Sequence, residues 1–373
     1  MRFIIVGDLF HPEELAKTRA GNLTAEAPLF PQSQAEYFYV RSLRKLGHQV
    51  EAFIRNVPAV FGVRARRSQR FAATKTAAML VQALAHRAPR LQPDYWLRNR
   101  RLIAQAKRFE PDVVLIIGGN RVIFPETLAR LKAEHGCRIV FMSGDSPIVF
   151  SSAIERASAP LYDLALVNDY YHGIQWLELG APRMEVLPMS ACDPEIHHRY
   201  PLTDSEQAEF GCDVGFVGTL LPPRLYSQRA QALEAVRDCG LGVWSVHDVP
   251  AALRPYYRGP ALGERMLRAV CGSKIQLNPN SNFMRYGGNM RLFEAPGCGV
   301  FQITNETPGA SLWFTPGETI VMYRDLPQLR QLVAYYLTHD AEREQIAQAA
   351  QAHVYAHHTY DHRMTRLVDL IGS

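Results

Sequence analysis

The stretch from Leu277 to Gly309, LNPNSNFMRYGGNMRLFEAPGCGVFQITNETPG, contains residue types that bind a phosphate group. Its pattern predicts a strand, a loop at Gly287 and Gly288, and a short helix that begins near Asn289. Glycines let a backbone approach a ligand closely, and the free amides and dipole at a helix N-terminus favour an anion. The loop and helix form a candidate phosphate site, but the glycine pair is equally consistent with a simple turn.

Two charged side chains on the same predicted helix extend this candidate site. Arg291 provides a planar cation, and Glu294 has two oxygens that can accept hydrogen bonds from a ribose diol. A carboxylate between Phe293 and Ala295 needs a partner, because both neighbours are apolar. Two interpretations stay open: Glu294 binds a ribose, or it pairs with a nearby arginine.

The sequence lacks the motifs of several other kinds of site. The first predicted strand is followed by Gly7-Asp8-Leu9-Phe10-His11, without the G-x-G-x-x-G of dinucleotide sites, and there is no GxxxxGK[ST] loop or GxSxG elbow. The six cysteines include no CxxC pair, and the histidine pairs 197–198 and 357–358 lack HExxH spacing. We expect buried free thiols, solvated or helix-end histidines, and neither a metal ion nor a bound cofactor.

Short β-rich apolar runs alternate with helix-length amphipathic segments, a pattern typical of parallel strands joined by crossover helices. The strands predicted in the first half are Phe3–Val6, Val50–Ile54, Val113–Ile117, Ile139–Met142, Leu164–Val167 and Met184–Leu187. After a polar linker, the predicted strands are Asp213–Val217, Leu241–Val246, Lys274–Leu277, Val300–Ile303 and Thr319–Tyr323. We expect an α/β protein with two Rossmann-like domains in tandem, facing a cleft that holds the ligand.

The expected domain limits are residues 1–190 for the first Rossmann-like domain and 191–357 for the second, which carries the candidate phosphate site. Residues 358–373 form a closing helix that we expect to pack back on the first domain. Of the 373 residues, 47% are hydrophobic and 21% are charged, which is ordinary for a globular protein. The apolar runs are far shorter than the roughly 18 to 20 residues that span a bilayer, and MRFIIVGD is too short for a signal peptide. We therefore expect a cytoplasmic protein.

The net charge of +5 is unevenly distributed, because residues 41–108 carry +14 and the rest of the chain carries −9. We expect a surface for an anionic acceptor, or for an anionic membrane, around Arg64, Arg66, Arg67, Arg70, Arg98, Arg100 and Arg101. The same arginines are equally consistent with an ordinary solvated surface. No RNA-binding motif, zinc finger or recognition-helix pattern accompanies them, so we do not expect nucleic acid as a partner.

Three runs carry a resemblance to a known family: NMRLFEAPGCGVF from Asn289, PGETIVMYRD from Pro316, and the tail from Glu342 to Arg363. With these runs the chain resembles the CgeB-like glycosyltransferases, relatives of the GT-B class whose C-terminal domain holds a nucleotide-sugar. The resemblance covers Cys212–Arg363. It is looser before that, where Asp145-Ser-Pro after a strand and the general topology match.

The resemblance also implies roles for single residues. Glu294 stands at the second glutamate of an E-x7-E motif, which holds the ribose in related retaining transferases, whereas Tyr286 departs from the first glutamate. In GFVGTLLPPR, Thr219 replaces an expected arginine and Arg224 an expected lysine. Arg224 suits a diphosphate, because its guanidinium is always charged and bonds in a bidentate manner. The implied nucleotide-sugar site is Thr219, Arg224, Tyr286, Gly287, Gly288, Asn289, Arg291 and Glu294.

The expected function is metal-independent transfer of a sugar from a nucleotide-sugar to a glycan, lipid-linked or protein acceptor. No DxD motif stands at a suitable strand end, so fixed cations and helix amides must stabilise the leaving diphosphate. An inverting reaction also needs a base from the first domain, and the candidates are Asp145, Asp8 and His11. Asp145 before Ser-Pro is equally suited to a turn or helix cap, and His11 to a loop.

Three other functions stay open from the sequence. A nucleotide-sugar 2-epimerase uses the same two-domain architecture and needs no acceptor. A non-catalytic protein that binds nucleic acid or another anionic polymer would use the +14 segment. A degenerate transferase-like partner would keep the fold without the activity.

Overall fold

The computed structural model describes residues 1–8, 35–56 and 88–372. This part of the chain forms two compact units. The first unit contains most of the chain up to Val186. The second unit runs from Leu187 onward and also includes two earlier segments, one ending at Tyr39 and the other Asn168–Tyr171.

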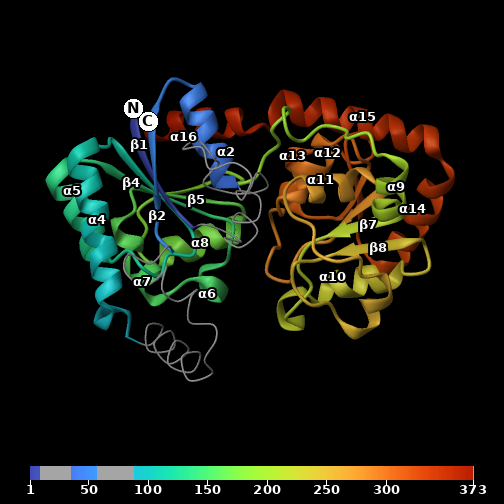
Figure 1. Ribbon diagram of the computed structural model, residues 1–373, viewed down its shortest axis with the longest axis horizontal. Coiled ribbons are helices and arrows are strands. Elements are labelled where there is room, and N and C mark those ends of the chain that lie inside the picture. The colour runs from blue at the N-terminus through green and yellow to red at the C-terminus, as the bar shows by residue number, and fades with distance from the viewer. Residues whose placement is uncertain (9–34, 57–87, 373) are drawn as a thin grey trace. The chain divides into compact units, whose positions relative to one another are not determined.

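A six-stranded parallel sheet forms the centre of the first unit (Figure 1). In spatial order its strands are β2 (Gln49–Ile54), β1 (Arg2–Gly7), β3 (Val113–Ile117), β4 (Arg138–Ser143), β5 (Leu164–Val167) and β6 (Met184–Val186). The helices are α2 (Ala35–Lys45), α4 (Pro93–Phe109), α5 (Pro125–His135), α6 (Pro147–Phe150), α7 (Ala153–Ala157) and α8 (Tyr170–Glu178), with 3-10 turns η1 (Pro89–Leu91) and η2 (Ala159–Leu161). Strands β3 and β5 are buried along their whole length, as parallel strands between helices must be.

The second unit has a five-stranded parallel sheet in the order β11 (Val321–Tyr323), β10 (Gln302–Asn305), β9 (Ser273–Asn278), β7 (Cys212–Val217) and β8 (Leu241–Trp244). Its first helices are α9 (Asp204–Phe210), α10 (Pro223–Ala235), η3 (Ala251–Tyr256) and α11 (Glu264–Cys271). They are followed by α12 (Arg291–Gly297), α13 (Pro308–Trp313), α14 (Leu326–Thr338), α15 (Asp340–His357) and α16 (Tyr360–Gly372). Helix α16 begins with Tyr360, whose ring stacks on Phe38 with centroids 4.4 Å apart; both residues belong to this unit.

The predicted α/β class with two parallel, Rossmann-like sheets is confirmed. Each predicted strand is present, within two residues at either end. All six cysteines are free thiols; four are buried and two are half-buried. None of the helices in the described ranges combines the length and the apolar character needed to cross a membrane.

Candidate functional site

The carboxyl ends of β7 and β9 are neighbours in the second sheet, and different helices follow them. Val214 and Phe216 of β7 pack on the side of α10 and α14, whereas Val217 packs with Ala295 of α12. Helices α10 and α12 therefore cover opposite faces of the sheet, since alternate strand residues point to opposite faces. Parallel α/β sheets bind ligands in the crevice at such a point.

Arg229, on α10, bridges the segments that follow these two strands. Its Nε donates to the Pro279 carbonyl after β9 at 3.0 Å, and its Nη1 donates to the Thr219 carbonyl after β7 at 3.1 Å. Burial lowers the pKa of the Arg229 guanidinium to about 10, and the charge of Arg291 acts in the same direction. Helices α10 and α12 thus each bring a guanidinium group to these strand ends, which favours an anionic ligand.

Arg291 begins α12 and forms an ion pair with Glu294 one turn later. Glu294 is fully buried, and its Oε1 lies 3.8 Å from Nε2 of buried His197 without a hydrogen bond. Of the two interpretations that the sequence left open, the structure shows the pairing with an arginine. Glu294 therefore orients Arg291 and offers no exposed carboxylate to a ribose.

The amide of Gly287 is also engaged within the protein. Asp169, two residues after β5, accepts hydrogen bonds at Oδ2 from the backbone N–H groups of Arg285, Tyr286 and Gly287, at 2.9, 2.6 and 3.1 Å. A Cβ at Gly287 would lie 2.0 Å from the Asn168 carbonyl. The glycine is needed for this contact within the protein, which corrects its expected role as a phosphate donor.

The other residues of the implied nucleotide-sugar site lie around the same crevice. Thr219 is half-buried, and Arg224, in the first turn of α10, has an exposed side chain. Oδ1 of Asn289 accepts from the Arg291 N–H at 2.9 Å just before α12, and buried Gly288 precedes it. Tyr286 is half-buried and packs against the ring of Tyr170, 5.8 Å away between centroids.

A pocket of about 280 Å³ opens beside the crevice. Amide and charged side chains predominate in its lining, which comprises Gln228, Gln231, Pro279, Asn280, Asn305, Glu306, Tyr323, Arg324, Asp325 and Leu326. Gln228 is the neighbour of Arg229 on α10, and Pro279 is one of the two residues that Arg229 contacts. The pocket therefore lies next to Arg229, and its polar lining suits a polar group.

The histidine pairs differ from the expectation of solvated or helix-end side chains. His197 and His358 are buried, and burial lowers the pKa of both, that of His358 to about 3. Nε2 of His358 is 3.0 Å from the Trp313 carbonyl, and its Nδ1 is 3.0 Å from Arg363. His198 and His357 are exposed, as predicted. Both buried rings are neutral core residues.

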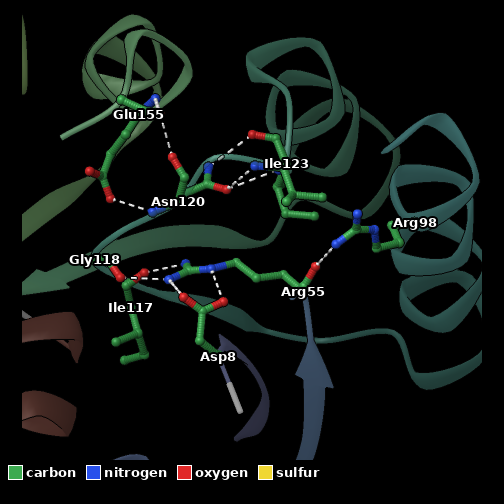
Figure 2. Close-up of polar contacts among 10 residues, drawn as sticks. Asp8, Arg55, Arg98, Ile117, Gly118, Asn120, Ile123 and Glu155 are labelled. Carbon is green, nitrogen blue, oxygen red and sulfur yellow. Dashed lines mark hydrogen bonds and ion pairs between the residues drawn. The ribbon is translucent and has the colours of Figure 1, made fainter. Parts of the chain in front are cut away.

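In the first unit, Asp8 is bound in an ion pair with Arg55 (Figure 2). Arg55 donates from Nε and Nη2 to the two carboxylate oxygens at 2.9 and 3.1 Å, and also to the carbonyls of Ile117 and Gly118. The Arg55 side chain is 1% exposed and that of Asp8 is 20% exposed. This corrects the assignment of Asp8 as a candidate base, because both of its oxygens neutralise a buried cation.

Glu155, on α7, contacts Asn120 in the loop that follows β3 (Figure 2). Its Oε1 accepts from the Asn120 N–H at 2.9 Å, and the residue is 2% exposed. Burial raises the pKa of the Glu155 carboxyl to about 7, and the nearby Asp145 carboxylate acts in the same direction. Glu155 thus changes its charge near neutral pH inside the first unit.

Asp145 follows β4, and its side chain is exposed. Its N–H donates to Oγ of Ser143 at 3.2 Å. Surrounding protein raises the pKa of its carboxyl by desolvation, although the side chain keeps solvent contact. A raised pKa and an accessible carboxylate are the properties of a general base, so Asp145 stays a prediction for that role.

Only some arginines of the basic segment, residues 41–108, lie on the surface. Arg100 is exposed on α4, but Arg98 is 6% exposed, pairs with Asp94 and donates to the Arg55 carbonyl. Arg98 therefore stabilises the interior, and its assignment to the acceptor surface is corrected. Five other predicted positions lie outside the described residues: His11, Arg64, Arg66, Arg67 and Arg70.

Three residues of these sites were not predicted from the sequence: Asp169, Glu155 and Arg229. Asp169 follows a strand as Asp8 and Asp145 do, so its position was a usable signal. Glu155 stands in the pattern Ser152-x-x-Glu155, which predicts a capping box; Ser152 does cap α7, but the carboxylate bonds to Asn120 instead. Arg229 carried no local signal.

Residues 227–369 match a family model described as glycosyl transferase-like. No curated protein sequence matches the chain. The matched region includes Arg229, the loop 285–287 and Arg291, so the candidate anion site lies within it.

Solved structures with a similar fold cover nearly the whole chain. HepE of Anabaena, in complex with UDP-glucose, is 13% identical with a TM-score of 0.62, covering 100% of this chain and 99% of its own. Sucrose-phosphate synthase of Thermosynechococcus elongatus is 11% identical with a TM-score of 0.63, covering 100% and 98%. A Listeria monocytogenes protein assigned as a UDP-N-acetylglucosamine 2-epimerase is 12% identical with a TM-score of 0.52, covering 100% and 96%. The two Rossmann-like units are those of the GT-B fold.

Proposed function

We propose that this protein is a glycosyltransferase that transfers a sugar from a nucleotide-sugar to an acceptor without a metal ion. The observation that carries the proposal is the pair of guanidinium groups, Arg229 and Arg291, at the carboxyl ends of β7 and β9. Both arginines lie within the region that matches the glycosyl transferase-like model, which supports the proposal. The complexes of HepE, a protein with the same fold, with UDP-glucose and with UDP also support it.

The chemistry of the proposed reaction requires such cations. Cleavage of the bond between sugar and phosphate leaves negative charge on the nucleoside diphosphate, and preorganised cations stabilise that charge as it develops. Arg229 is held by two carbonyls and Arg291 by Glu294, so both have fixed positions before the ligand binds. Exposed Arg224 adds a third cation from the same edge. The pocket beside Arg229 accepts one of the groups that flank the diphosphate.

The proposal is tested by a thermal-shift screen of UDP, GDP, dTDP, ADP and CMP with their sugars. A ligand that binds only the native state raises its apparent stability, so the correct donor gives the largest shift. Product analysis of that donor without an acceptor then separates the functions. A transferase releases free sugar slowly, whereas an epimerase gives the epimeric nucleotide-sugar. The absence of a shift with every nucleotide would contradict the proposal.

Neutralising Arg291 is expected to weaken nucleotide binding by about 10- to 100-fold. Loss of a hydrogen bond to a charged group costs about 1.5 to 3 kcal/mol, which corresponds to this range. Arg291→Gln keeps a donor for Glu294 and removes the charge. The measurement is the dissociation constant by calorimetry. Arg237→Met, which removes an exposed arginine just after α10, is the control and should bind as the parent does.

Activity is expected to survive chelation. Among residues 1–8, 35–56 and 88–372, no three His, Cys, Asp or Glu side chains are grouped so as to hold a metal ion. Turnover measured in EDTA should equal turnover in buffer, and addition of Mg²⁺ should not raise it. Complete loss of turnover in EDTA, reversed by Mg²⁺, would show that the diphosphate needs a cation that these arginines do not replace.

For the acceptor we propose a glycan, lipid-linked or protein substrate that approaches the exposed part of the basic segment, in a cytoplasmic protein that contacts anionic membranes peripherally. Arg100 is exposed there, and Leu91 and Trp96 nearby are 78% and 53% exposed. Exposed aromatic and aliphatic side chains beside arginines are typical of peripheral membrane contacts. Sedimentation with phosphatidylglycerol vesicles, compared with neutral vesicles, tests this part of the proposal.

A further inference from the structure

The carboxylate of Asp169 is bound by four backbone N–H groups. Oδ2 accepts from Arg285, Tyr286 and Gly287, and Oδ1 accepts from Tyr171 at 3.0 Å. Asp169 is 0% exposed, and it belongs to the second unit together with the loop 285–287. The carboxylate itself is therefore closed off from any ligand.

Successive N–H groups that converge on one point form an anion site, and here the protein itself supplies the anion. A buried carboxylate is costly unless it is hydrogen-bonded, and three converging amides repel one another without an acceptor. Each partner therefore stabilises the other. The pairing fixes the backbone conformation of the loop 285–287 more strongly than neutral hydrogen bonds would.

The same loop is held from its other side. The Gly287 carbonyl accepts from Asn280 Nδ2 at 3.3 Å and from Thr307 Oγ1 at 3.1 Å, and the Tyr286 carbonyl accepts from the Gly309 N–H at 2.8 Å. Gly287 also fits against the Asn168 carbonyl, with no room for a Cβ. The loop is therefore held through its N–H groups by Asp169 and through its carbonyls by these donors.

The position of this loop determines where the candidate donor site begins. Gly288, Asn289 and the first residue of α12, Arg291, follow Gly287 directly. Nδ2 of Asn289 donates to Oδ1 of Asn280 at 3.2 Å, and its Oδ1 accepts from the Arg291 N–H, so the fixed conformation continues to the start of α12. A displacement of residues 285–287 would therefore move the start of α12 and the guanidinium of Arg291.

We infer that Asp169 is a positioning residue for the nucleotide-sugar site. It touches neither the nucleotide nor the sugar, and acts by fixing the loop that places Asn289 and Arg291 at the crevice. The inference rests on the proposed function, because it assigns the site that Asp169 positions. It adds a residue more than one hundred positions away in sequence from the loop that it controls.

The test compares the full-length parent with Asp169→Ala and Asp169→Asn, using UDP as the probe in calorimetry. Asp169→Ala should raise the dissociation constant at least tenfold, and Asp169→Asn, which keeps one acceptor oxygen, should give an intermediate value. Sodium formate should restore the affinity of Asp169→Ala to within about threefold of the parent, because formate fills the vacated anion site. In donor hydrolysis, KM should rise while kcat changes little.

Asp163→Ala is the matched control. Asp163 accepts from the Ile139 N–H at 2.8 Å and pairs with Lys132, but it lies in the first unit. This variant should bind UDP as the parent does, and formate should have no effect.

The outcomes separate the inference from the function on which it rests. A parent that binds neither UDP nor another nucleotide overturns both. A parent that binds UDP, with a folded Asp169→Ala that binds it equally well, overturns only the role of Asp169. Weaker binding that formate does not restore, with a fall in melting temperature alike in Asp169→Ala and Asp169→Asn, would show a purely structural role. If Asp169→Ala does not fold, Asp169→Asn decides by its KM and kcat.

Discussion

Replacement of Asp8 by alanine is expected to destabilise the first unit by about 3 to 5 kcal/mol. The side chain of Arg55 is 1% exposed, and Asp8 is the carboxylate that pairs with it directly. Removing one partner of a buried ion pair leaves the other charge without compensation, which is the origin of a loss of this size. The measurement is the free energy of unfolding by chemical denaturation, followed through the transition of the first unit.

Two further variants isolate the cause of this destabilisation. Asp145→Ala removes an exposed carboxylate at another strand end and should change stability by less than about 0.5 kcal/mol. Adding Arg55→Met to Asp8→Ala should recover part of the loss, because the uncompensated charge is removed. If Asp8→Ala is as stable as the parent but loses transfer activity, then Asp8 acts on the acceptor and the structural assignment is wrong.

The strands could be predicted closely because each is a short apolar run between turn residues. Val113–Ile117 and Leu164–Val167 were predicted to the residue, since both are buried on two faces and no polar residue interrupts them. The strand predicted at Val300–Ile303 begins instead at Gln302. The N–H of Val300 donates to the Ala295 carbonyl of α12, so its backbone is bonded to the helix terminus and is not paired in the sheet.

The candidate site could be predicted in place but not in detail. The sequence located the strand ends and the start of α12, because local patterns determine them. It did not provide the partners of the charged side chains. Asp8 pairs with Arg55 47 positions away, and Asp169 binds amides 116 to 118 positions away. Such pairings depend on which loops the sheet order brings together, and no local periodicity records this order.

The same limit applies to Gly287 and Glu294. A glycine in a loop before a helix and a carboxylate within that helix fit a phosphate and ribose site, and they fit equally well a tightly packed loop and a buried ion pair. The tertiary contacts with Asn168 and Arg291 decide between these alternatives. Glu294 and Asp169 therefore act on the same cation from opposite directions, one through the side chain of Arg291 and the other through the backbone before it.

Glu155→Gln is expected to become more stable than the parent as the pH rises, by up to about 3 kcal/mol at pH 8. Folding raises the pKa of Glu155 from an ordinary value of 4.5 to about 7, chiefly through burial. Because folding raises this pKa, the contribution of Glu155 to the free energy of unfolding of the parent is fully present below about pH 4.5. It is lost as the pH rises through about 7. The shift of about 2.5 pH units sets the upper bound, at about 1.36 kcal/mol for each unit.

Glutamine resembles the protonated glutamate and keeps an oxygen for the Asn120 N–H, so the two proteins should have equal free energies of unfolding near pH 4.5. The measurement is chemical denaturation of both proteins at intervals from pH 4.5 to pH 8. Buried His358 has a lowered pKa and changes stability with pH in the opposite sense. Since both proteins contain it, its contribution cancels when the two free energies of unfolding are subtracted. Glu178→Gln, at an exposed position on α8, should give a curve parallel to that of the parent. If the free energy of unfolding of Glu155→Gln also runs parallel to that of the parent, Glu155 ionises in the folded protein as it does in water. Burial would then not keep its carboxyl protonated.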